Sequence, residues 1–149
     1  MKSDKTLLWI FGALAVVICA MFFATDLPVG FLRGGAAKPV PGTVYELTAD
    51  NLAAARRVPV LVALFTTQGN MDATRMARTL PSLANRIKDS AIVAHGNVDA
   101  EPDLADKVGV KELPAWIIYR DGKEVSRAIG KNADVSLNRL IKEQTGKAP

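Results

Sequence analysis

"PVLVALFTTQGNMDATRM", residues Pro59–Met76, decides the fold, because it changes from an apolar run to a polar turn and then to a helical pattern. The run from Pro59 to Phe65 contains no polar side chain, which is typical of a strand that is covered on both faces. After the turn, apolar residues recur at spacings of four, three and four, which predicts one buried face of a helix over residues 71–88. These residues are Met76, Leu80, Leu83 and Ile87.

The rest of the domain alternates strand and helix patterns, and Asp121-Gly122 predicts a tight hairpin turn between the last two strands. We expect strands at 43–47, 59–65, 91–98, 115–119 and 123–129, and helices ending near Ala55, at 71–88, at 101–108 and around Leu137–Ile141. The order β-α-β-α-β-α-β-β-α predicts an α/β fold in which a central mixed sheet is flanked by helices.

The N-terminal part predicts a membrane anchor. Residues 6–25 (TLLWIFGALAVVICAMFFAT) carry no charge, and a helix of this length covers roughly 30 Å, the thickness of the hydrocarbon core. The alternative is a cleaved signal peptide, but cleavage after Ala24 puts the large Phe22 where a small residue is preferred. Lys2 and Lys5 favour an N-terminus on the inside, so we expect a single-pass inner-membrane protein with its domain in the periplasm.

We therefore divide the chain into a basic tail (1–5), a transmembrane signal-anchor helix (6–25), a linker (26–42) and a folded domain (43–149). The linker contains three prolines and four glycines in 17 residues, which disfavours a packed element.

Composition predicts few chemical functions for the domain. The net charge of +4 is modest and no basic block with interleaved aromatics occurs, so we expect no nucleic-acid partner.

Cys19, the one cysteine, lies in the apolar run and is interpreted as an ordinary helix residue. His95, the one histidine, reads as a strand residue that faces no carboxylate cluster. We expect no metal site and no cofactor.

Several short strings, in order and spacing, resemble the thioredoxin family over residues 43–144. They are Pro59-Val60-Leu61-Val62, Asn97-Val98-Asp99, Leu104-Ala105, Val108-Gly109-Val110, Leu113-Pro114, and Tyr119-x-Asp121-Gly122 with Gly130. The resemblance implies a thioredoxin-like fold in which Pro114 follows a cis peptide bond.

The chain departs from this family at its active-site CxxC motif. Counting four residues from Phe65 places the motif at Gly69–Asp72, whereas taking Pro81 as the family's helix proline places it at Ala73–Met76, after a four-residue insertion. Neither alignment contains a cysteine. The family's buried aspartate, which relays protons, is also replaced, by Ala63. We therefore expect a redox-inactive member that is not an enzyme.

A surface for protein recognition remains. In this fold the loop before the cis-proline faces the start of the long helix, and the backbone there can pair with an extended peptide. The residues that we expect to bind a partner are Gln68, Gly69, Asn70, Met71, Glu112, Leu113 and Pro114. The leading hypothesis is a membrane-tethered binding or assembly factor that serves a protein complex of the cell envelope. The alternative is a component of a thiol–disulfide oxidoreductase pathway that depends on cysteines of its partner protein.

Overall fold

A computed structural model describes residues 38–146, which alternate strands and helices in the predicted order. The strands are β1 (Val44–Glu46), β2 (Val60–Thr66), β3 (Ile92–Asn97), β4 (Ala115–Arg120) and β5 (Lys123–Ile129). The helices are α2 (Leu52–Ala55), α3 (Met71–Ile87), α4 (Pro102–Val108) and α5 (Ala133–Thr145).

The five strands form one mixed sheet in the order β1-β3-β2-β4-β5. β1, β3 and β2 are parallel, while β4 is antiparallel to β2 and β5 is antiparallel to β4. β2 is the central strand and is buried along its whole length. The predicted mixed sheet is therefore confirmed.

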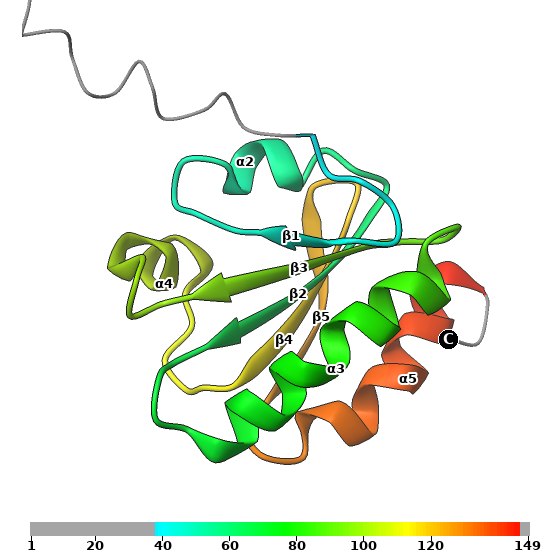
Figure 1. Cartoon of the computed structure of the whole chain (residues 1–149). Helices are drawn as coiled ribbons and strands as arrows, with labels where there is room; N and C mark the ends of the chain where they lie inside the picture. Colours follow the sequence, from blue (N-terminus) through cyan, green and yellow to red (C-terminus); the bar gives the residue numbers. More distant parts are fainter. Residues whose placement is uncertain (1–37, 147–149) are drawn as a thin grey trace, which may run out of the picture. The chain divides into compact units, whose positions relative to one another are not determined.

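Helices cover both faces of this sheet, which explains the apolar run in β2 (Figure 1). α3 and α5 lie on one face, and α2 and α4 lie on the other. Alternate residues of β2 enter the two cores: Leu61, Ala63 and Phe65 lie in the core with α2 and α4. Val60, Val62 and Leu64 lie in the core with α3 and α5.

α3 starts at Met71 because Asn70 caps it and the apolar stripe of the helix is buried against the sheet. The Asn70 side-chain oxygen accepts a hydrogen bond from the Ala73 N–H at 3.0 Å, which satisfies one of the free donors of the first turn. The four residues of the predicted stripe are all buried. The helix continues through Pro81 to Ile87.

Two local predictions at the β4–β5 end are also confirmed. The Leu113–Pro114 peptide bond is cis. Asp121 and Gly122 have positive φ angles of 50° and 82°, the backbone that a two-residue hairpin turn needs.

The membrane prediction falls on a part of the chain that the structure does not describe. No helix within residues 38–146 is long and apolar enough to cross a bilayer. The predicted span at 6–25, the basic tail and most of the linker lie outside the described residues. The anchor and the four segment boundaries stay predictions.

Candidate functional site

The turn between β2 and α3 is held by a carboxylate from the next strand-to-helix connection. Asp99 follows β3, and its carboxylate accepts hydrogen bonds from the Gln68 N–H and, at 2.7 Å, from the Thr67 hydroxyl. Both bonds lower the pKa of the Asp99 carboxyl below its ordinary value, and the bond from the Gln68 N–H has the larger effect. The sequence pattern around Asp99 indicates no such contact, so this positioning role was missed.

Asn70 joins the two segments that were predicted to form the binding surface. Its side-chain oxygen caps α3, while its side-chain nitrogen donates a long hydrogen bond, 3.5 Å, to the carbonyl oxygen of Leu113. Residues 68–71 and residues 112–114 therefore lie side by side. We call these seven residues the Asn70–Leu113 surface.

The loop side of the Asn70–Leu113 surface has backbone groups without partners. Pro114 is buried, and its carbonyl accepts a hydrogen bond from the Gly130 N–H at 2.8 Å. Leu113 is half-buried against the core, and Glu112 is exposed. Within residues 38–146, no hydrogen bond reaches the Leu113 N–H or the backbone of Glu112.

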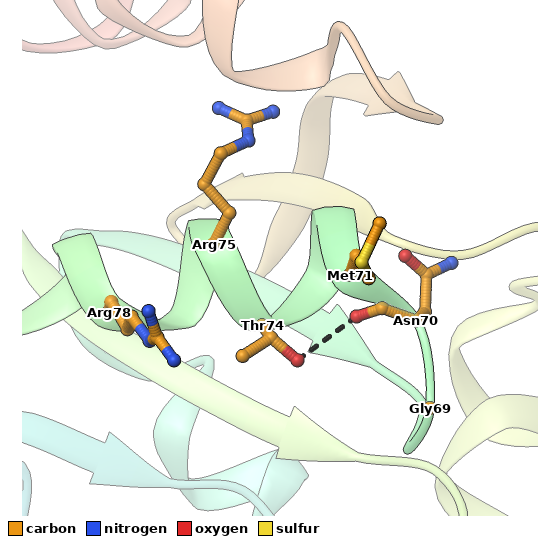
Figure 2. Close-up of a pocket in the computed structure, with 6 residues that line it drawn as sticks. All are labelled: Gly69, Asn70, Met71, Thr74, Arg75 and Arg78. Carbon is orange, nitrogen blue, oxygen red and sulfur yellow. Dashed lines mark hydrogen bonds between the residues drawn. The ribbon is translucent and has the colours of Figure 1, made fainter.

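The helix side of the surface opens into a shallow hollow of about 400 Å³ (Figure 2). Its lining residues are Gly69, Asn70, Met71, Thr74, Arg75 and Arg78. Met71 is 86% exposed, so this methionine leaves a flexible apolar side chain at the edge of the hollow. We call this feature the Arg78 hollow, and it shares three residues with the Asn70–Leu113 surface.

The family model described as "Thioredoxin" matches residues 50–143. The chain belongs to the thioredoxin family. The thioredoxin of Chlamydia caviae is 38% identical over 56 residues, which cover 38% of this chain and 55% of that protein. The thioredoxin of Chlorobaculum thiosulfatiphilum is 30% identical over 67 residues, covering 45% of this chain and 62% of that protein.

Solved thioredoxin structures show the same fold. A mutant thioredoxin from Halobacterium salinarum superposes with a TM-score of 0.65 at 23% identity, covering 74% of this chain and 97% of that one. The thioredoxin of Malassezia sympodialis gives a TM-score of 0.63 at 17% identity, with 71% and 95% coverage. The matched segments span about half the length of the curated relatives.

The family match corrects one expectation outright. We expected that the chain is not an enzyme, and this is wrong: its relatives are named thioredoxin, which is a thiol oxidoreductase. The expectation relied on the absence of cysteine from the CxxC position of the domain and on the replacement of the buried aspartate by Ala63. A thiol for exchange can come from outside the domain, so that absence alone does not exclude a place in thiol chemistry.

The start of α3 distinguishes the two alignments of the missing CxxC in this thioredoxin domain. Gly69–Asp72 surround the N-terminus of the helix, next to Leu113. In the other alignment, Ala73 and Met76 would hold the motif's ends, but both side chains are only 1% exposed. The exposed start of α3 therefore favours Gly69–Asp72 over the alignment that begins and ends at the buried residues Ala73 and Met76.

The proton-relay position of the family is filled by apolar packing. Ala63 is fully buried, and it pairs across the sheet with Ala94 on β3 and Ile117 on β4. This position therefore brings no titratable side chain to the thioredoxin site. The predicted replacement of the aspartate leaves an apolar core below the surface.

His95 lies on β3, and its ring contacts two side chains that the sequence alone does not indicate. Its Nε2 lies 2.8 Å from the Thr66 hydroxyl, and its Nδ1 lies 3.7 Å from a carboxylate oxygen of Glu46. These three residues come from β2, β3 and β1, so the contact depends on strand pairing rather than on sequence spacing.

Proposed function

We propose that this thioredoxin-family domain binds an extended segment of a partner protein on the Asn70–Leu113 surface. The observation that carries the proposal is the open backbone of Leu113. Its N–H has no hydrogen-bond partner among residues 38–146, and its carbonyl accepts only the long bond from Asn70. An extended segment can pair with such a backbone, and its alternate side chains then reach Met71 and the start of α3.

The proposed role of this binding is thiol–disulfide exchange in which the partner supplies the cysteines. Family membership supports the redox pathway. The sequence of the domain, residues 43–149, contains no cysteine, so a thiol that reacts at the surface has to arrive with the bound segment. The domain then contributes recognition and orientation of the reacting chain.

We propose that this reaction takes place in the periplasm, at the surface of the inner membrane. Residues 6–25 would anchor the chain in the inner membrane, and the linker would hold the domain on the periplasmic side. The bacterial periplasm favours disulfide formation, so client proteins with reactive cysteine pairs are present there.

Photo-crosslinking tests the binding proposal. A photo-reactive residue is placed at Met71 or Glu112, because both side chains are exposed and neither makes a hydrogen bond within the described residues. Lys142, exposed on α5, is the control position. We expect both surface positions to trap the same partner in intact cells, and Lys142 to trap none of it. Equal labelling from all three positions contradicts the proposal.

A second experiment tests the source of the thiol. The full chain and its Cys19→Ser variant are compared for their effect on disulfide exchange in the trapped partner. We expect equal rates, because Cys19 lies outside the domain and takes no part in the proposed step. A loss of the rate in Cys19→Ser would identify Cys19 as the reacting thiol and refute the partner's role as the source.

A further inference from the structure

The Arg78 hollow extends the Asn70–Leu113 surface along the exposed face of α3. Met71 and the three lining residues that follow it at spacings of three, four and seven lie on the exposed side of α3. They are Met71, Thr74, Arg75 and Arg78. The buried residues of the same turns, Ala73, Met76 and Leu80, point into the core. A segment bound at the surface can therefore continue over the hollow.

The two arginines of the hollow differ in their charge environment. Arg75 donates hydrogen bonds to Asp134 at 2.5 Å and to the carbonyl of Lys131 at 3.2 Å, and it lies 3.6 Å from Asp72. The hydrogen bond to Asp134 is the main reason why the pKa of Arg75 is raised. Figure 2 shows Arg75 and Arg78 extending to different sides of the helix.

Arg78 has no ion pair and no hydrogen bond among residues 38–146. None of the six lining residues is acidic, and the nearby Asp72 is paired with Arg75. The Thr74 hydroxyl already donates to the Asn70 carbonyl at 3.0 Å, as Figure 2 shows. Its hydrogen is therefore not available to a bound carboxylate, which leaves Arg78 as the donor. The positive charge of Arg78 is thus the uncompensated charge of the hollow.

We infer that Arg78 binds a carboxylate side chain of the same partner segment that pairs with Leu113, so that the site selects acidic partners. This inference rests on the proposed function and names the chemistry of the partner. A guanidinium that is free of other partners forms paired hydrogen bonds with a carboxylate. The exposed side chain of Met71 offers an apolar contact at the other end of the hollow.

Helix geometry predicts the spacing of the two contacts in the partner. Met71 and Arg78 are seven residues apart on α3, which is roughly 10 Å along the helix axis. An extended chain advances about 3.3 Å per residue and its side chains alternate between two faces, so an acidic residue on the same face as the apolar residue should lie two or four positions from it. The inferred motif is therefore an apolar residue with an aspartate or glutamate two or four residues away.

A peptide-display experiment tests this motif. Random twelve-residue peptides are selected on the purified full chain, on Arg78→Ala and on Arg86→Ala. Arg86 is the matched control, since it is an exposed arginine in the last turn of the same helix, outside the hollow. We expect acidic residues at the inferred spacing to be enriched by the wild-type chain and by Arg86→Ala, and not by Arg78→Ala.

The affinity of one selected peptide and its Glu→Gln form gives the size of the effect. The wild-type chain should bind the glutamine form about fivefold more weakly, and this ratio should fall toward one at high salt. Arg78→Ala should bind both forms equally, while Arg78→Lys should keep part of the ratio.

Different failures have different meanings. If no peptide is selected by the wild-type chain, the proposed function itself is contradicted. If peptides are selected that contact Leu113 but show no acidic preference, only the role of Arg78 is contradicted. Loss of the acidic preference in Arg86→Ala as well would attribute it to overall charge, and the hollow would have no part in it. Circular dichroism of each variant confirms that it is folded.

Discussion

Asn70 supports the start of α3 and also contacts the loop before Pro114, so substitutions can separate its two bonds. Asn70→Ala removes both the cap to the Ala73 N–H and the bond to the Leu113 carbonyl. The loss of a cap costs about 1 kcal/mol of the free energy of unfolding. The bond to Leu113 is 3.5 Å long, so its loss adds only a few tenths of a kcal/mol.

Asn70→Ser is the matched variant, because serine keeps an oxygen that can cap the helix but has no donor that reaches Leu113. We expect Asn70→Ala to lower the melting temperature of the domain by about 5 °C, and Asn70→Ser to lower it by less than about 2 °C. Thermal unfolding of the purified full chain, followed by circular dichroism, measures both. Equal losses in the two variants, or no loss in Asn70→Ala, would refute the capping role assigned to Asn70.

Three further predictions test the packing, the turn and the anchor. A Cβ at Gly96 would lie 2.7 Å from a Leu104 methyl group and 2.9 Å from the Phe65 ring. Gly96→Ala should therefore destabilise the domain by about 1–3 kcal/mol in urea unfolding, and adding Leu104→Val should recover part of this loss. The pKa of Asp99 is lower in the folded state, so its contribution to the free energy of unfolding should be present above about pH 4 and be lost as the pH falls through the folded value. Asp99→Asn should remove that part of the pH dependence of stability, and an unchanged pH profile in this variant would contradict the role of Asp99. Carbonate washing should leave the full chain in the membrane fraction and release a variant without residues 1–25, and release of both would contradict the anchor.

The elements of the domain were predictable because their patterns are local. The apolar run that ends at Phe65 predicted a doubly covered strand, and the spacing from Met76 to Ile87 predicted the buried face of α3. Asp121-Gly122 predicted the hairpin from two letters alone. In each case, the residues that determine the structure are neighbours in the chain.

The contacts of the site were less predictable because they join distant residues. Asp99 holds Gln68, which is 31 positions away, and Asn70 reaches Leu113 across 43 positions. His95 meets Glu46 and Thr66 only after three strands have paired. The predicted binding residues could be named from the resemblance. The unpaired charge of Arg78 could not be predicted, because it depends on the pairing of the nearby carboxylates Asp72 and Asp134 with Arg75.

Hydrogen exchange of the Leu113 amide tests the central claim most directly. The free amide has no partner among residues 38–146, so it should exchange rapidly in the unbound chain. When the trapped partner or a selected peptide is bound, we expect exchange at Leu113 to slow by about tenfold or more, because the amide then donates to the bound backbone. Unchanged exchange at Leu113 in the complex, with protection elsewhere on the domain, would contradict the account.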